Sequence, residues 1–387
     1  MDGVTITLLF LIFAIVMFVW ERIPLSVTAM IVAVGLVVTG VLSPKDAFAG
    51  FVDTNVLLFM AMFIVGAAFF ETGVARDVGG IVTKFAGTER KLIISVMLIT
   101  GLMSGFLSNT GTAAVLIPVA IGLAQRAGFN RAKFLLPLVL ASAMGGNLSL
   151  IGAPGNMIAQ SGLSKIGLSF GFFDYALIGL PVLIVGILYF VLIGYKLLPD
   201  EPARQPEEIY EETDYSKVPK YKKWIAGIVL IATIVGMIFE QQIGIKLYVT
   251  AWIGAIVLIV TGTISETAAV KSIDMKTILL FVGSLALADA LVKTGTGTVV
   301  ADAIIGALGS HPSPFVLMAV VFIISAVLTN FMSNTATTAL LVPIGISLAQ
   351  QVGADPKAVL MATVIGGAEG GFNGQTAASS GNDKYHS

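Results

Sequence analysis

Two copies of the tripeptide Ser-Asn-Thr lie in the middle of apolar stretches, at residues 108–110 and 333–335. Each copy places an amide and two hydroxyls in an apolar environment. Burying a polar group there without a hydrogen-bond partner costs on the order of 1–3 kcal/mol of stability. If the backbone turns there, helix N-termini offer amides to an anion and helix C-termini offer carbonyls to a small cation. Such side chains also join packed membrane helices. Because the tripeptide occurs twice in register, we expect a binding site.

A second polar interruption is the run GGNLSLIGAPGN at residues 145–156, inside an otherwise hydrophobic stretch. Proline removes a hydrogen-bond donor and glycine weakens the helix, so the run predicts an unwound segment with exposed amides and carbonyls. Such a segment is tolerated in a membrane only where it faces protein or water. The alternative is a helix that is merely kinked by packing.

Ionisable side chains are missing from these central segments, which contain no Asp, Glu, His, Lys or Arg. Hydrolytic chemistry would need a nucleophile with a base, paired acids or metal ligands, so an intramembrane enzyme or a structural subunit is a weak alternative. The chain has no cysteine, and its histidines, His311 and His386, are peripheral, so we expect no cofactor and no metal catalysis. An anion bound here would lack a fixed cation, which favours co-binding of Na⁺ or exchange of one anion for another.

The composition predicts an integral membrane protein, because 56% of the 387 residues are hydrophobic and only 12% are charged. Glycine is abundant, with 42 residues, which suits close helix packing and broken helices. The net charge of -1 gives no basic excess, so we expect a lipid bilayer and no nucleic acid as partner. The first apolar run lacks a cleavage motif and is interpreted as a retained helix, with the mature chain starting near Met1.

A spanning helix needs roughly 20 apolar residues. Hydropathy predicts seven clear spans, at residues 4–20, 24–42, 54–73, 172–198, 225–239, 247–263 and 275–292. Three further regions are apolar but interrupted, at 92–125, 133–163 and 314–350, and such interruptions are typical of re-entrant hairpins and broken helices. The polar stretch 199–223 predicts a solvated linker that divides the chain in two.

The two halves repeat each other. Residues 104–128 align without a gap to residues 329–353, at a constant offset of 225, and share SNT, a proline and LAQ at the same spacing. The first half crosses the membrane an odd number of times, so the second half must enter from the opposite side. We therefore predict an all-α polytopic membrane protein with an inverted-topology repeat, two re-entrant helical hairpins and broken helices.

The predicted organisation has four parts. Residues 1–198 form the first repeat, with three helices, the hairpin 92–125, the broken helix 133–163 and the helix 172–198. Residues 199–223 form a cytoplasmic linker, residues 224–368 an incomplete second repeat and residues 369–387 a polar tail.

The positions of Lys and Arg predict the orientation. With the N-terminus outside, sixteen of these residues fall on the cytoplasmic side, and only Lys45, Lys165, Lys246, Lys293 and Lys357 fall outside. We therefore predict a multi-pass protein of the plasma membrane with the loop 199–223 in the cytoplasm. Among the carboxylates, Asp53 and Asp274 are expected to cap helices, and Asp289 to lie at the interface next to Lys293.

At both Ser-Asn-Thr tips and the run 145–156 the sequence resembles the divalent anion:sodium symporter family, the carriers of dicarboxylates, citrate and sulfate, over roughly residues 1–368. The resemblance implies a homodimer with elevator-like transport domains and one sodium site in each half. It places the first sodium site at Ser104, Ser108, Asn109 and Gly152, and the second at Thr329, Met332 and Asn334. It places substrate contacts at Asn109, Thr110, Asn334 and Thr335, with Ala153 and Pro154 nearby.

The second half departs from the family pattern. The offset maps residues 152–156 onto 377–381, which contain neither the proline nor the final asparagine, and the last helix of the first half has no counterpart. The chain is either a truncated or frameshifted family member or one with a genuine variant tail, and we favour truncation, with a half-built second sodium site.

The sequence thus predicts a secondary carrier, not an enzyme, for a small divalent anion of the succinate, malate, citrate or sulfate class. Sodium symport is the expected coupling. The alternatives are an anion exchanger that uses no sodium and an arsenite or ion antiporter of the wider ion-transporter group, which a buried carboxylate on the broken helices would favour.

Overall fold

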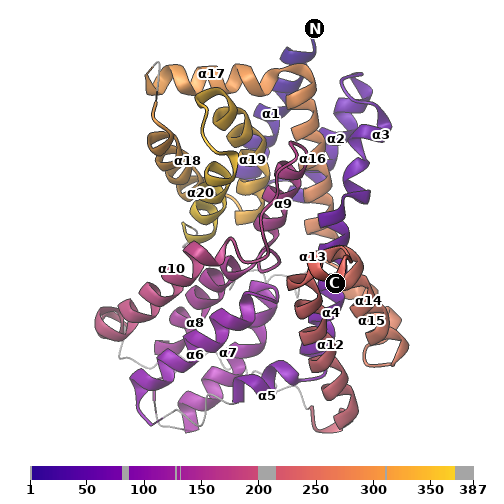
Figure 1. Ribbon diagram of the computed structural model, residues 1–387. Coiled ribbons are helices and arrows are strands. Elements are labelled where there is room, and N and C mark those ends of the chain that lie inside the picture. Colours follow the sequence, from indigo (N-terminus) through magenta and orange to yellow (C-terminus); the bar gives the residue numbers. More distant parts are fainter. Residues whose placement is uncertain are drawn as a thin grey trace. The chain divides into compact units, whose positions relative to one another are not determined.

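The protein is described by a computed structural model that covers residues 2–80, 87–126, 129–130, 132–198, 215–309 and 312–370. Throughout these residues the secondary structure is helical, as Figure 1 shows, and the all-α prediction is confirmed. The predicted linker at 199–223 falls largely outside the described residues, and so does the tail beyond residue 370. Contacts divide the chain into two compact units, which are described separately below.

Unit 1 contains Met1–Met60, Pro154–Gly171 and the chain from Asp274 to Gly370. Its elements are α1 (Gly3–Trp20), α2 (Leu25–Val38), α3 (Pro44–Ala47), the 3₁₀ turn η1 (Ala49–Val52), the start of α4 (Thr54–Glu71), α9 (Pro154–Ser164), α16 (Met275–Thr294), α17 (Thr296–Leu308), α18 (Pro314–Leu328), α19 (Asn334–Val352) and α20 (Pro356–Glu369). The core of unit 1 lies where α16 packs against α2 and α19. A Cβ atom on Gly283 would lie 2.4 Å from the Ala29 carbonyl oxygen, so glycine is what allows α16 to approach α2 so closely.

Unit 2 contains Ala61–Ala153 and Phe172–Ile273. Its elements are the remainder of α4, α5 (Val74–Gly80), α6 (Glu89–Ser104), α7 (Asn109–Arg126), α8 (Ala132–Gly145), the 3₁₀ turn η3 (Gly146–Leu148), α10 (Ala176–Tyr189), the π-helical turn η4 (Phe190–Gly194), α11 (Tyr195–Leu197), the 3₁₀ turn η5 (Tyr215–Lys217), α12 (Lys220–Ile238), α13 (Glu240–Ile243), α14 (Leu247–Val260) and α15 (Glu266–Ser272). Helix α8 packs against α6, α7 and α10, while α12 packs against α14.

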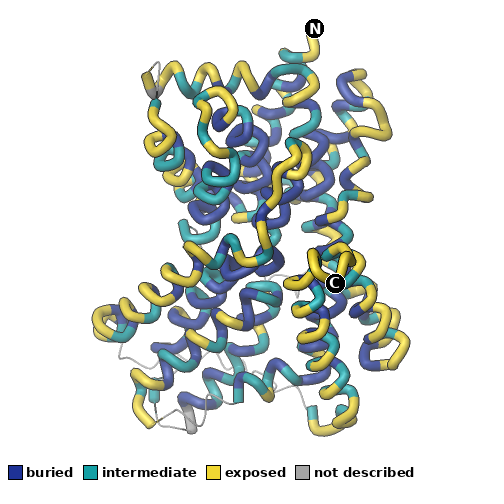
Figure 2. Tube along the Cα trace, viewed as in Figure 1, coloured by how far each residue is buried: buried dark blue, intermediate teal, exposed yellow. Residues whose placement is uncertain are grey.

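Helix length and exposure support membrane insertion. Six described helices are long and apolar enough to span a bilayer: α1, α4, the continuous stretch Ala176–Leu197, α12, α16 and α19. Only 22% of the Ala176–Leu197 window is buried, against 67% for α16, and Figure 2 shows the contrast between exposed α10 and buried α16. Two of the predicted spans, 24–42 and 247–263, are α2 and α14, which have 14 residues each and fall short of the roughly 20 that a bilayer requires.

The repeat is visible as a shared arrangement of helices. In the first copy α6, α7 and α8 follow one another, and α18, α19 and α20 follow in the second, with breaks at residues 105–108 and 329–333. The predicted break in 133–163 is also present, since α8 ends at Gly145 and α9 begins at Pro154. Whether the hairpins are re-entrant stays a prediction, and so do the domain boundaries. The two units do not follow the two sequence halves, because each unit takes segments from both.

Glycine contacts set the packing of α8 on α6 within unit 2. A Cβ atom on Gly145 would lie 2.2 Å from the Gly101 carbonyl oxygen, and one on Gly105 would lie 2.9 Å from Leu148 Cβ. From Gly101 to Gly105 along α6, the contacted residue moves forward from Gly145 to Leu148, so α6 and α8 run parallel. The second copy has the same contact, since a Cβ atom on Gly370 would lie 2.5 Å from Ala326 Cα.

We predict that Gly145→Ala destabilises the protein by about 1–3 kcal/mol, because the new methyl group would overlap backbone that cannot move aside easily. The measurement is the thermal unfolding midpoint of the purified protein. Gly306→Ala in α17 is the matched control, because nothing lies within 4 Å of its Cβ position, and it should leave the midpoint unchanged or raised. Equal midpoints for the two variants would contradict this packing argument.

Candidate substrate and ion site

The first Ser-Asn-Thr tip lies in unit 2, where α6 ends at Ser104 and α7 begins at Asn109. Ser108 is the N-cap of α7, because its Oγ accepts a hydrogen bond of 3.1 Å from the Gly111 amide. The predicted sodium ligand Ser108 therefore has a structural role as a cap.

Oxygen atoms gather behind this tip. Ser104 Oγ lies 2.6 Å from Asn109 Oδ1 and 2.6 Å from the Ser142 carbonyl oxygen, and Ser142 Oγ donates to the Asn109 carbonyl at 2.7 Å. The Ser104 hydroxyl has one hydrogen and cannot donate fully to both of its acceptors. The arrangement is therefore richer in acceptors than in donors, which suits a cation.

The unwound segment adds carbonyl groups to the same place. Ser149 Oγ donates to the Gly105 carbonyl, and a Cβ atom on Gly152 would lie 2.4 Å from the Gly146 carbonyl oxygen and 3.0 Å from that of Gly105. Gly105 follows the C-terminus of α6 and Gly146 follows that of α8, so two negative helix ends meet at Gly152. We call Ser104, Gly105, Asn109, Ser142 and Gly146 the oxygen cluster.

The second tip lies in unit 1 and repeats part of this geometry. Ser333 caps α19 by accepting from the Ala336 amide at 3.1 Å, and Thr329 Oγ1 donates to Asn334 Oδ1 at 2.5 Å. The Thr329–Asn334 contact corresponds to Ser104–Asn109. Met332 is fully buried in the apolar core of unit 1. The residues aligned with the unwound loop lie outside the described chain.

Two helix N-termini lie side by side in unit 1. Helix α9 begins at Pro154 and α19 begins at Asn334. A Cβ atom on Gly155 would lie 3.0 Å from Thr338 Oγ1, and one on Gly162 would lie 2.6 Å from Val342 Cγ1, so the two helices run parallel. Their amide-bearing, positive ends therefore share one end of unit 1, which suits an anion.

Side chains of α9 and α19 make further hydrogen bonds. Thr338 Oγ1 donates to the Asn334 carbonyl at 3.0 Å in α19. On α9, Ser161 Oγ donates to Asp53 Oδ1 at 2.9 Å. Asp53 also accepts from the Asn55 amide at 2.9 Å, which confirms its predicted role as a helix cap. Asp274 is confirmed as a cap as well, accepting from the Lys276 and Thr277 amides.

The predicted substrate residues are more exposed than most of the predicted ion ligands. Among the substrate candidates, Thr110 and Asn334 are exposed, and Asn109, Ala153, Pro154 and Thr335 are partly exposed. Of the ion candidates outside that set, Ser104, Gly152, Thr329 and Met332 are buried and Ser108 is partly exposed. The structure brings Ser104, Asn109 and Gly152 together in unit 2, and Pro154, Asn334 and Thr335 belong to the paired helix starts of unit 1.

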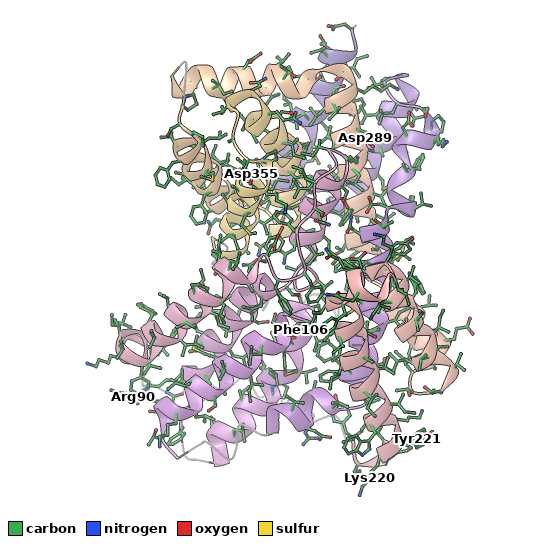
Figure 3. All side chains as sticks on the ribbon, viewed as in Figure 1. Arg90, Phe106, Lys220, Tyr221, Asp289 and Asp355 are labelled. Carbon is green, nitrogen blue, oxygen red and sulfur yellow. The ribbon has the colours of Figure 1, made fainter. Side chains whose placement is uncertain are left out.

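Few of the described charged side chains are buried. Among the described residues, Lys133 is the one buried charged side chain, and no group of His, Cys, Asp and Glu there could hold a metal ion. Asp289, labelled in Figure 3, contacts Lys165 Nζ, while Lys293 lies 3.9 Å from Asp46. Asp289 and Lys293 lie four residues apart on α16, and the Asp289–Lys165 pair joins α16 to the end of α9.

No hydrogen-bonding role was predicted for Ser142, for Thr338 or for Ser149, although Ser149 lies inside the run 145–156. The signal that could have found them is a hydroxyl within one helical turn of a Gly pair or of an Asn, since such hydroxyls satisfy broken helix ends. Only the partners of their hydrogen bonds reveal the role, because Ser and Thr are common in membrane helices for packing alone.

We predict that Ser333→Ala weakens anion binding as well as stability. Removing an N-cap costs about 1 kcal/mol and releases the first amides of α19 from their fixed direction. Ser313→Ala is the matched control, because Ser313 caps α18 by accepting from the Val316 amide at 3.4 Å. Both variants should lower the unfolding midpoint of purified protein similarly. If binding assays with a citrate or succinate panel found equal affinities for both, the anion role of the α19 start would be wrong.

Comparison with known proteins identifies related sequences. The chain matches the citrate transporter family over residues 15–366. It is 34% identical to the uncharacterized transporter YfbS of Escherichia coli over 211 residues, which is 54% of this chain and 35% of YfbS, so the matched part spans about a third of that protein. An uncharacterized transporter of Haemophilus influenzae is 29% identical over 360 residues, covering 88% of this chain and 76% of the relative.

A solved structure shares the fold. The crystal structure of the YdaH transporter of Alcanivorax borkumensis matches with a TM-score of 0.58, covering 92% of this chain and 87% of that chain. The sequence identity is 15%, so this likeness concerns the fold alone.

Proposed function

The chain belongs to the citrate transporter family, and from that premise we propose that it is a secondary active transporter of dicarboxylates or similar divalent anions, of the succinate, malate, citrate or sulfate class. Membership confirms the family resemblance seen in the sequence. The family and the named relatives are transport proteins and not enzymes, and the apolar helices make this a multi-pass membrane protein.

The observation that carries the proposal is the pair of parallel helix starts in unit 1. The amides at the starts of α9 and α19 face the end where Pro154, Asn334 and Thr335 lie. Each helix N-terminus carries roughly half a positive charge, so two of them offset much of the charge of one carboxylate. The Asn334 amide and the Thr335 hydroxyl add donors without adding a fixed cation, which suits an anion that must also be released.

Sodium coupling is proposed from the oxygen cluster of unit 2. Na⁺ is a hard cation that takes oxygen ligands, and unwound carbonyls at helix C-termini supply them in broken-helix transporters. The cluster offers the carbonyls of Gly105, Ser142 and Gly146 together with Ser104 Oγ and Asn109 Oδ1. The equivalent place in unit 1 has Gly367 where unit 2 has Ser142, so the described part of the second site has one hydroxyl fewer.

The remaining features of the proposed carrier follow the family resemblance. We propose alternating access of the elevator type in a homodimer of the plasma membrane, with the N-terminus outside and the loop 199–223 in the cytoplasm. The positions of Lys and Arg support this orientation.

We predict that purified protein in liposomes takes up a divalent anion only when sodium is present outside. The measurement is uptake of radiolabelled citrate, succinate or sulfate, with choline replacing sodium as the control. Unchanged uptake in choline would contradict sodium coupling, and uptake that needs an internal anion would show exchange instead.

We predict that Ser104→Ala raises the sodium concentration for half-maximal uptake or binding by about 10- to 150-fold, because an oxygen contact to a charged group is worth roughly 1.5–3 kcal/mol. Ser95→Ala is the control: Ser95 lies on the same helix, and its hydroxyl donates to the Lys91 carbonyl. The sodium dependence should shift only for Ser104→Ala. An equal shift in both variants would indicate a general loss of α6 stability.

A further inference from the structure

A compact group of aromatic and charged side chains joins three helices of unit 2 at the N-termini of α6 and α8. Arg90 Cζ lies 5.4 Å from the centre of the Tyr195 ring, and Lys133 Nζ lies 4.7 Å from it. The Tyr195 hydroxyl donates to the Glu89 carboxylate. These four residues, the Tyr195 cluster, come from α6, α8 and α11, so the first hairpin and the broken helix are tied to the exposed helix α10–α11.

The segments that form this cluster carry more positive than negative charge. Lys91 follows Arg90 along the chain and Lys196 follows Tyr195, so with Lys133 these segments hold four cationic residues and one carboxylate, Glu89. Arg90, Lys91 and Lys196 are exposed, whereas Lys133 is only 7% exposed. Lys133 is therefore buried against the Tyr195 ring and contributes to packing. The exposed side chains of Arg90, Lys91 and Lys196 remain accessible to an external anion.

The adjoining surface is apolar and faces outward. Leu188, Leu192 and Leu197 on the α10–α11 stretch are 51%, 63% and 70% exposed. This stretch is one of the spans long enough to cross a bilayer, so its exposed side chains suit lipid acyl chains. The π-helical turn Phe190–Gly194 precedes Tyr195, and such turns are frequent at functional sites.

We propose that the Tyr195 cluster, with Lys91 and Lys196, binds the phosphate headgroup of an anionic phospholipid whose acyl chains lie along α10–α11. Arg90 supplies a planar guanidinium that can donate two hydrogen bonds to one phosphate. Basic groups between helices near a membrane surface attract such headgroups. The bound lipid holds the starts of α6 and α8 against α11, and so stabilises the base of the first hairpin.

The test compares purified full-length chain in nanodiscs of phosphatidylcholine with and without phosphatidylglycerol. Phosphatidylglycerol should raise the unfolding midpoint of the wild type by about 5 °C. Arg90→Gln with Lys196→Gln should remove most of this gain and weaken phosphatidylglycerol binding, measured by native mass spectrometry, by about 30-fold, since each cation near an anionic surface contributes roughly fivefold. Figure 3 labels Arg90.

The matched control removes the same charge elsewhere in unit 2. Lys220→Gln with Lys222→Gln changes two lysines at the start of α12 and should keep the midpoint gain; Lys220 is labelled in Figure 3. The unfolding midpoint of each variant in pure phosphatidylcholine shows whether the substitutions impair folding. If the double variant is impaired, the single variant Lys196→Gln, which changes an exposed side chain, is used to measure phosphatidylglycerol affinity. Three results would each overturn the proposal. Phosphatidylglycerol could raise the midpoint of the Arg90→Gln, Lys196→Gln variant as much as that of the wild type, the control variant could lose the same midpoint gain, or inorganic phosphate could produce the gain that phosphatidylglycerol does.

Discussion

Broken helices inside a bilayer expose backbone amides and carbonyls that water cannot reach, and the structure of this protein depends on how those groups are satisfied. The N-terminal ends of α7 and α19 are each capped by the serine of a Ser-Asn-Thr tip. The C-terminal ends of α6 and α8 meet at the oxygen cluster in unit 2. The same constraint thus produces two chemically opposite surfaces, one rich in amide donors and one rich in oxygen acceptors. The first surface suits the anion and the second the cation of the proposed transport cycle.

Close packing at glycines makes these helix ends meet. Gly145 on Gly101 and Gly152 beside the Gly146 carbonyl leave no room for a side chain, so the helix ends pack closely where Ser104 bonds to Asn109 and to the Ser142 carbonyl. In unit 1, Gly155 and Gly162 allow α9 to lie against α19. Close packing of small residues therefore determines where the polar ends lie, and the polar ends determine what can bind. Among the described residues, Asp289 is paired with Lys165 and Lys223 with Asp77, while Asp53 accepts a hydrogen bond from Ser161 of α9.

Much of this could be predicted from the sequence, because composition and the repeat constrain a membrane chain strongly. The breaks at 105–108, 146–153 and 329–333 fall where Gly, Pro, Ser and Asn interrupt apolar runs. The sequence could not show that α2 and α14 have only 14 helical residues each, because the apolar runs continue into turns beyond the helix ends. Nor could it reveal that Ser142 bonds to Asn109 and Ser149 to Gly105, because these contacts join segments far apart in the chain. The parallel alignment of α9 and α19 likewise arises from tertiary packing, which hydropathy does not record.

The central claim is that the adjoining starts of α9 and α19 bind a divalent anion, and that sodium strengthens this binding. The most direct measurement is the thermal unfolding midpoint of the purified chain with citrate, succinate, malate or sulfate, each in sodium and in choline salts, for the wild type and for Thr335→Val. At a ligand concentration of 100 times Kd, binding stabilises a protein by about 2.7 kcal/mol. The account predicts a raised midpoint with at least one anion, a larger rise in sodium, and loss of the rise in Thr335→Val. Midpoints that no anion changes, or a rise that Thr335→Val retains in full, would contradict it.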